Sequence, residues 1–183
     1  GLWIEPEMIN KDSNLYRQHP DWILQTPGRT DSHGRYQYVL DFSRREIVDY
    51  IYTMIAKILS EAKISYIKWD MNRSITECYS IAYPAERQGE IFHRYILGVY
   101  DLYERLTSEF PKVLFESCAS GGGRFDPGML YYAPQGWTSD DSDAIERLKI
   151  QYGTSMCYPI SSMGSHVSVI PNHQVFRNTP LHT

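Results

Sequence analysis

The chain of 183 residues has 42% hydrophobic, 22% charged and 14% aromatic residues, which excludes a disordered segment and indicates a globular domain. Its formal net charge of −4 gives no electrostatic reason to expect nucleic acid or an anionic membrane as a partner. No apolar run approaches the roughly 20 residues that span a bilayer, so no membrane segment is expected.

The first part of the chain alternates strand and helix patterns. Residues 1–4 predict a short buried strand, and residues 11–37 are polar with several turn signals. Residues 38–41 fit either a strand or the approach to a helix. A helix is predicted from Ser43 to about Lys63, because Ser43 and Glu46 match a capping box. Its predicted buried face consists of Ile47, Ile51, Met54, Ile55, Ile58 and Ala62.

The second part continues the same alternation. Residues 64–70 predict a strand, residues 87–110 a helix, residues 113–118 a strand, residues 136–140 a strand and residues 144–153 a helix. The helix over 87–110 has a predicted buried face of Ile91, Tyr95, Val99, Leu102 and Leu106. Residues 158–162 and 167–170 fit strands or loops.

Repeated strand, loop and helix units predict an α/β fold with parallel strands covered by helices. Two architectures fit, an open doubly wound sheet and a (β/α)₈ barrel. The chain has about four or five such units, whereas a barrel has eight and roughly 250 residues. A barrel would therefore be represented by its middle and later units. The chain opens on a strand without an initiator methionine and closes without a terminal helix, which predicts a fragment of a longer protein.

Polar residues collect at the ends of the predicted strands, where barrel enzymes place their catalytic groups. Asp70 and Asp140 follow two different strands, and two such carboxylates can carry out glycoside hydrolysis. The alternative is structural: Asp70 could cap a loop, and the cluster at 140–143 could stabilise the N-terminus of the next helix. Asp141 and Asp143 fit that capping role best.

Lys68 lies two residues before Asp70 on the same strand face. A fixed cation there would keep Asp70 ionised, as a nucleophile requires. The alternative is a surface lysine whose stem follows apolar neighbours, which an inward strand position makes hard to accept.

The glycines at 121–123 precede Arg124, but neither phosphate-loop pattern is present, so nucleotide binding is poorly supported. These glycines are instead expected to let the backbone approach a ligand closely. The three cysteines lie far apart without a C-x-x-C, which excludes a disulfide scaffold and favours a cytoplasmic location. The six histidines show no ligand spacing, so neither a metal nor a cofactor is expected.

The segment 68–73, Lys-Trp-Asp-Met-Asn-Arg, resembles the nucleophile motif of glycoside hydrolase family thirty-six, the α-galactosidases and their relatives. Segments 1–8, 116–124, 137–143 and 164–168 resemble further motifs of that family, in the same order. The resemblance covers nearly the whole chain.

This resemblance implies that residues 1–183 are part of a catalytic (β/α)₈ barrel that hydrolyses terminal α-galactosyl groups with retention of configuration. Asp70 matches the nucleophile and Asp140 the acid/base. The residues that match substrate-binding positions are Trp3, Arg35, Lys68, Trp69, Asn72, Cys118, Gly121 and Gly123. Of these, Cys118 and the two glycines match a stretch near the 2-hydroxyl of the sugar.

The family also implies parts that this chain lacks: an N-terminal β-sandwich, the first barrel strands and a C-terminal β domain. The isolated chain is therefore expected to be inactive and only partly folded. The expected partners are α-galactoside oligosaccharides of the melibiose and raffinose type, and the parent protein is expected to form a homotetramer.

Four alternatives stay open. A raffinose-family galactosyltransferase would pass the galactosyl group to a sugar instead of water. An α-N-acetylgalactosaminidase is a further relative, although Cys118 and its glycines favour an unsubstituted 2-hydroxyl. A non-catalytic galactoside-binding fragment and an open-sheet nucleotide enzyme belong to other classes, and the second lacks any phosphate-loop motif.

Overall fold

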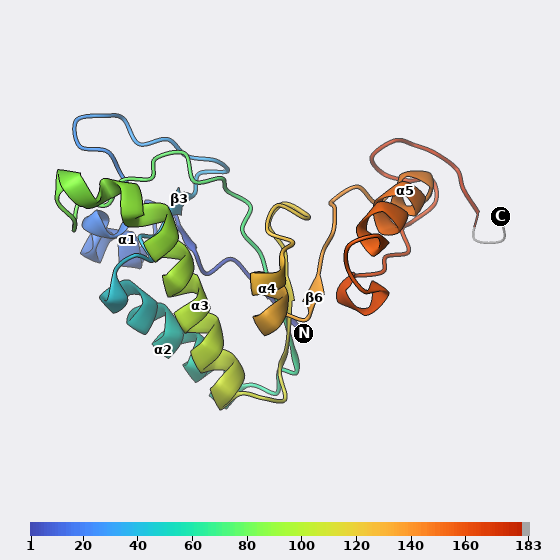
Figure 1. The fold of residues 1–183 in the computed structure, drawn as a ribbon, viewed down its shortest axis with the longest axis horizontal. Coiled ribbons are helices and arrows are strands. Elements are labelled where there is room, and N and C mark those ends of the chain that lie inside the picture. Colours follow the sequence, from blue (N-terminus) through green and yellow to red (C-terminus); the bar gives the residue numbers. More distant parts are fainter. Residues whose placement is uncertain (181–183) are drawn as a thin grey trace. The chain divides into compact units, whose positions relative to one another are not determined.

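The computed structural model describes residues 1–180 in two compact units, Gly1–Leu114 and the part from Phe115 onward (Figure 1). Each unit contains a pair of parallel strands and helices. The predicted α/β class with parallel strands is therefore confirmed.

In the first unit, β1 (Leu2–Ile4) pairs in parallel with β4 (Tyr66–Trp69). Trp3 lies opposite Lys68 in this register. The backbone N–H of Asp70 donates to the carbonyl of Ile4 at 2.9 Å, which extends the pairing one residue past β4. This bond places Asp70 at the carboxyl end of the strand pair.

Strand β2 (Met8–Ile9) pairs antiparallel with β3 (Tyr38–Val39) in a separate two-stranded sheet. The segment 38–41 is therefore a strand over its first two residues. Between these strands lie helix α1 (Asn14–Gln18) and the 3₁₀ turn η1 (Pro20–Trp22). The remainder of the connection consists of turns and irregular backbone, in agreement with its polar composition.

Helix α2 (Arg45–Glu61) confirms the first predicted helix, but the predicted capping box is wrong. The hydroxyl of Ser43 donates to the carboxylate of Asp41, and Glu46 accepts from Nε of Arg44 at 2.7 Å. Asp41 is fully buried and needs donors, so it takes the serine that would otherwise have bonded to the helix. Within the described residues, the N-cap residue of α2, Arg44, makes no side-chain capping hydrogen bond.

The buried face of α2 is also narrower than predicted. Met54 and Ile58 are 38% and 44% exposed, and Ala62 is exposed beyond the end of the helix. The residues of α2 that are buried are Ile47, Val48, Ile51, Ile55 and Leu59.

Helix α3 (Ile91–Glu109) follows the 3₁₀ turn η2 (Ala85–Glu90) and lies beside α2 (Figure 1). All five residues of its predicted buried face are buried, as is Tyr103, whose ring stacks on Trp69 with centroids 4.1 Å apart. A Cβ at Gly98 would lie 2.0 Å from the carbonyl oxygen of Phe42, so only glycine permits this approach of the helix.

In the second unit, β5 (Leu114–Ser117) pairs in parallel with β6 (Gln135–Gly136), and α4 (Pro127–Tyr132) lies between them in sequence. The strand predicted over 136–140 is wrong beyond Gly136, because residues 137–143 form a loop. Helix α5 (Ala144–Ser155) confirms the last predicted helix. The segment 158–162 contains the 3₁₀ turn η3 (Ile160–Ser162), and residues 167–170 are not a strand.

Candidate active site

Asp70 lies at the carboxyl end of β4 with only 6% of its surface exposed. Its Oδ2 accepts hydrogen bonds from the indole N–H of Trp3 at 3.1 Å and from the amide of Asn72 at 2.7 Å. Its Oδ1 accepts from the backbone N–H of Met71 at 2.9 Å. Donors to both oxygens orient the carboxylate and stabilise its negative charge.

Glu5 connects this carboxylate to a second group of polar residues. Its Oε1 accepts from Asn72 Nδ2 at 2.8 Å and from a guanidinium nitrogen of Arg35 at 3.1 Å. Its Oε2 accepts from Gln37 Nε2 at 2.9 Å. The sequence reasoning missed Glu5, although the signal that selected Asp70, a carboxylate directly after a strand, also applies to it.

Arg35 is presented on a strained turn. The backbones of Gly34 and Gln37 exchange hydrogen bonds at 3.3 and 2.8 Å, and the residues between them, Arg35 and Tyr36, have φ of 56° and 60°. Turns with two left-handed residues usually contain glycine or asparagine, and other side chains cost free energy there. Strain of this kind is typical of functional segments.

Lys68 and Trp69 lie on opposite faces of β4. Lys68 is half-buried and lies on the face of Asp70, as predicted. Trp69 is fully buried, and its indole N–H donates to Glu7 Oε1 at 2.8 Å while Tyr95 donates to the other oxygen of Glu7. This geometry gives Trp69 a packing role, and its predicted place in the segment that binds the galactose hydroxyls stays a prediction.

In the second unit, Asp140 is exposed on the loop after β6. The indole N–H of Trp137 donates to Asp140 Oδ1 at 3.0 Å. Asp143 is the N-cap of α5, with Oδ2 accepting from the N–H of Glu146 at 3.1 Å, and Asp141 accepts from the N–H of Asp143 at 2.9 Å. The predicted capping role of Asp143 is therefore confirmed. The Asp140 carboxylate instead accepts from Trp137.

The glycine loop packs against the segment that contains Asp140. A Cβ at Gly121, where φ is +82°, would lie 2.8 Å from the backbone nitrogen of Asp140. A Cβ at Gly122 would lie 2.5 Å from the carbonyl oxygen of Thr138, and one at Gly123 would lie 2.6 Å from that of Ala119. These glycines thus allow a close approach of the protein's own backbone, and their predicted approach to a ligand stays a prediction.

Cys118 is buried at the end of β5, and the three cysteines, Cys78, Cys118 and Cys157, are not joined in disulfides. Burial, followed by the negative charge of Asp41, raises the pKa of Cys78 to about 11. Within residues 1–180, no three His, Cys, Asp or Glu side chains are grouped so that they could hold a metal ion. No helix of that part of the chain is long and apolar enough to cross a membrane.

The sequence matches the Melibiase family over residues 1–183. Alpha-galactosidase AgaA of Geobacillus stearothermophilus is 61% identical over 183 residues, which cover 100% of this chain and 25% of that protein. Crystal structures of AgaA variants in complex with raffinose and with stachyose each match with a TM-score of 0.97 at 60% identity, again over 100% of this chain and 25% of theirs. The chain spans about a quarter of the length of these relatives. Because the family match extends over the entire sequence, the chain belongs to the Melibiase family, the α-galactosidases of glycoside hydrolase family thirty-six.

Proposed function

We propose that the protein containing this chain is a retaining α-galactosidase, with Asp70 as nucleophile and Asp140 as acid/base. Its substrates are terminal, non-reducing α-galactosyl residues of raffinose-type oligosaccharides. The observation that carries the proposal is the buried carboxylate of Asp70 at a strand end, oriented by Trp3 and Asn72.

In the first step, an oxygen of Asp70 forms a bond to the anomeric carbon of galactose while the bond to the leaving oxygen breaks. Asp140 gives its proton to that leaving oxygen. In the second step, Asp140 takes a proton from water, and the resulting hydroxide displaces Asp70 from the anomeric carbon. A retaining mechanism of this kind requires the two carboxyl groups to be about 5–5.5 Å apart.

The environments of the two aspartates suit these different roles. Asp70 is buried, and the donors to both of its oxygens orient the carboxylate for attack and stabilise its charge. Asp140 is exposed, so a leaving group and a water molecule can reach it in turn, and Trp137 orients it through Oδ1.

The AgaA complexes support the assignment. In the raffinose complex an aspartate is replaced by asparagine, in the stachyose complex another aspartate is replaced by alanine, and these two positions are 70 residues apart. Asp70 and Asp140 are also 70 residues apart in this chain. An enzyme without a carboxylate that the reaction needs leaves its substrate intact in the crystal.

Substrate contacts are proposed for the side chains around each aspartate. Trp3, Lys68, Asn72 and Arg35 would bind hydroxyl groups of the galactose near Asp70, and the exposed ring of Trp3 offers an apolar face to the sugar. Cys118, Gly121 and Gly123 would lie near the 2-hydroxyl. Glu5 joins this set because it holds both Asn72 and Arg35.

The proposal extends to the architecture of the whole protein. Residues 1–183 would be the middle and later units of a catalytic (β/α)₈ barrel, completed by earlier barrel strands, an N-terminal β-sandwich and a C-terminal β domain. The whole protein is proposed to be a homotetramer, which light scattering after gel filtration would test.

The decisive experiment uses an AgaA chimera, in which this chain replaces the matching 183 residues of Geobacillus stearothermophilus AgaA. We expect the chimera to hydrolyse an aryl α-galactoside and raffinose, with α-galactose as the first product detected by proton NMR. Asp70→Ala should abolish turnover, whereas Glu104→Ala on the exposed surface of α3 should not.

Two outcomes would contradict the proposal. β-Galactose as the first product would show inversion, and near-normal activity of Asp70→Ala would remove its role as nucleophile.

Added azide should give the Asp70→Ala variant only β-galactosyl azide, because a single displacement inverts the anomeric carbon. Added sucrose that diverts most galactosyl groups into a trisaccharide would instead identify a galactosyltransferase.

A further inference from the structure

The loop that carries Asp140 is held by side chains from two other segments of the second unit, helix α5 and the chain near residue 174. The backbone carbonyl before Asp140, its own carbonyl and the carbonyl after it all accept hydrogen bonds from side chains. A loop usually leaves such groups to water. The donors are Arg147 and Gln174.

Arg147 is 6% exposed and binds both sides of Asp140 with one guanidinium nitrogen. Nη1 donates to the carbonyl of Ser139 at 2.8 Å and to that of Asp141 at 3.3 Å. Nη2 donates to the carbonyl of Gly164 at 3.2 Å, which connects the loop to the segment after η3.

The same guanidinium also supports the residue that contacts the Asp140 carboxylate. Its central carbon lies 4.6 Å from the centre of the Trp137 ring, within the range of a cation–π interaction. The indole N–H of that ring donates to Asp140 Oδ1. Arg147 therefore contacts both the backbone around Asp140 and the side chain that orients its carboxyl group.

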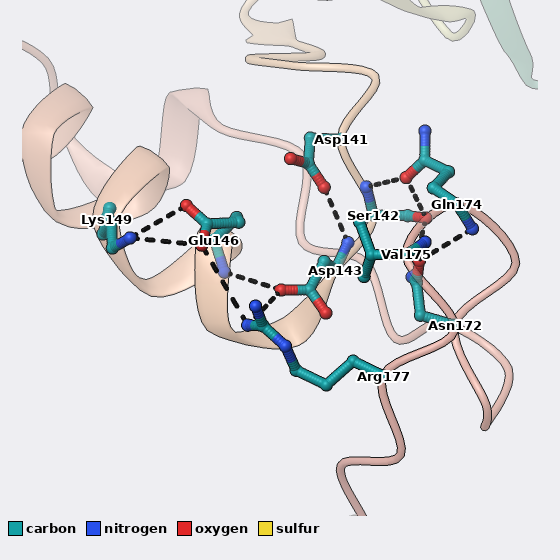
Figure 2. Close-up of polar contacts among 9 residues, drawn as sticks. All are labelled: Asp141, Ser142, Asp143, Glu146, Lys149, Asn172, Gln174, Val175 and Arg177. Carbon is teal, nitrogen blue, oxygen red and sulfur yellow. Dashed lines mark hydrogen bonds and ion pairs between the residues drawn. The ribbon is translucent and has the colours of Figure 1, made fainter.

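Gln174 holds the loop from the other segment. Its Nε2 donates to the carbonyl of Asp140 at 3.0 Å, and its Oε1 accepts from the backbone N–H and the hydroxyl of Ser142 at 2.7 and 2.8 Å. Figure 2 shows Gln174 directed at Ser142, with Asn172 beside it. The buried Asn172 fixes this segment, because its Oδ1 accepts from the N–H groups of Gln174 and Val175.

The arrangement around Arg147 is costly for stability alone. Among its hydrogen bonds in the described part of the chain, every acceptor is a carbonyl, a hydroxyl or an amide oxygen, and none is a carboxylate. Burial lowers the pKa of Arg147, opposed by the charge of Asp141. A buried charge without a hydrogen-bonded counter-ion is disfavoured. If this side chain only filled space, an uncharged residue would be the more stable choice.

We propose that Arg147 and Gln174 are positioning residues that hold the carboxyl group of Asp140 in the orientation for proton transfer to the leaving oxygen. This inference rests on the proposed function, in which Asp140 is the acid/base. Neither residue touches the reacting atoms, and each acts through the backbone of the loop or through Trp137.

The test compares two leaving groups in the AgaA chimera. Melibiose has a poor leaving group that needs a proton, whereas a dinitrophenyl α-galactoside departs without one, and general acid catalysis contributes about 10²–10⁴-fold. We expect Arg147→Met to lower kcat/KM for melibiose at least tenfold more than kcat/KM for the aryl substrate, because kcat/KM reports the first step, in which only melibiose needs the proton. Gln174→Met should show a smaller loss with the same selectivity.

Controls separate this role from general damage. Arg147→Lys keeps the charge but loses the planar fork, so it should recover part of the selective loss. Lys149→Gln, on the exposed face of the same helix, should leave both rates unchanged. Equal losses on both substrates in Arg147→Met and Gln174→Met would show a merely structural role and overturn the proposal.

Asp140→Asn distinguishes this failure from that of the proposed function. If Asp140→Asn shows the selective loss on melibiose and the positioning variants do not, the positioning inference is wrong. If Asp140→Asn itself lowers kcat/KM for both substrates equally, the acid/base assignment is wrong. Should Arg147→Met not fold, Gln174→Met and Arg147→Lys carry the same comparison.

Discussion

The side-chain amide of Asn72 donates to the carboxylate of Asp70 at 2.7 Å, and the same nitrogen lies 2.8 Å from the carboxylate of Glu5. An amide nitrogen has two N–H groups, so Asn72 can serve both acceptors at once. Glu5 in turn accepts from Arg35. One asparagine thus connects the proposed nucleophile to the strained turn that carries Arg35.

Asn72→Ala should therefore lower kcat/KM of the AgaA chimera about 10- to 100-fold, since a hydrogen bond to a charged group contributes roughly 1.5–3 kcal/mol. The loss should be similar for melibiose and for an aryl galactoside, because Asp70 attacks in both reactions. Asn14→Ala on the exposed helix α1 is the control. Unchanged kinetics in Asn72→Ala would show that this bond does not orient the nucleophile.

Trp69→Phe should act on stability. The ring is fully buried against Tyr103, and removing its N–H leaves Glu7, which is also buried, without one donor. Loss of a partner for a buried charged group costs at least about 1–3 kcal/mol. Urea unfolding should show a lower midpoint for Trp69→Phe than for wild type. A raised KM with unchanged unfolding would instead support the predicted contact of Trp69 with substrate.

Alanine in the glycine loop should displace the segment that contains Asp140. A Cβ at Gly121 or Gly122 would lie within 2.8 Å of the backbone of Asp140 or Thr138. Gly121 also has a positive φ, which makes alanine strained there whatever the space. We expect activity on melibiose to fall at least tenfold in both variants, if Asp140 must be held for proton transfer.

Gly153→Ala is the matched control for the glycine loop, because nothing lies within 4 Å of the added Cβ in helix α5. This variant should be more stable by up to about 1 kcal/mol, since alanine is the better helix former. Normal activity in Gly121→Ala and Gly122→Ala would show that the loop tolerates movement.

The sequence predicts the structure correctly where the pattern is long or depends only on neighbouring residues. The helix over 91–109 has a regular buried face across 19 residues, and this periodicity predicts five of its six buried positions, all but Tyr103. The place of Asp70 at a strand end follows from the predicted strand before it, and the capping role of Asp143 follows from its place before a helix.

The errors arise from contacts between distant residues. Ser43 matches a capping box locally, but the buried carboxylate of Asp41 competes for its hydroxyl. The hydrogen bond from Trp69 to Glu7, 62 residues away in sequence, is likewise a contact that only the fold reveals. Arg147 and Gln174 carry no local signal, because their acceptors are backbone carbonyls of a loop that periodicity does not define.

Asp41 predicts a specific dependence of stability on pH. Burial raises its pKa above 3.8, although hydrogen bonds from Ser43 and Ser80 oppose the shift. The folded state therefore holds the proton more tightly than the unfolded chain does. This contribution to stability is fully present below pH 3.8 and is lost as the pH rises through the raised pKa.

Asp41→Asn removes the ionisation while its amide can still accept from Ser43 and donate to the hydroxyl of Ser80. The variant should gain stability relative to wild type as the pH rises from 4 toward 8, measured as the difference in urea midpoints across that range. Asp12→Asn, on an exposed side chain, should show no such trend. A constant difference between Asp41→Asn and wild type at every pH would mean that Asp41 does not retain its proton above the range of an ordinary carboxyl group.

The thiol of Cys78 offers a second readout of the same variant. Loss of the Asp41 charge should lower the pKa of Cys78 from about 11 and speed the alkylation of this thiol at alkaline pH.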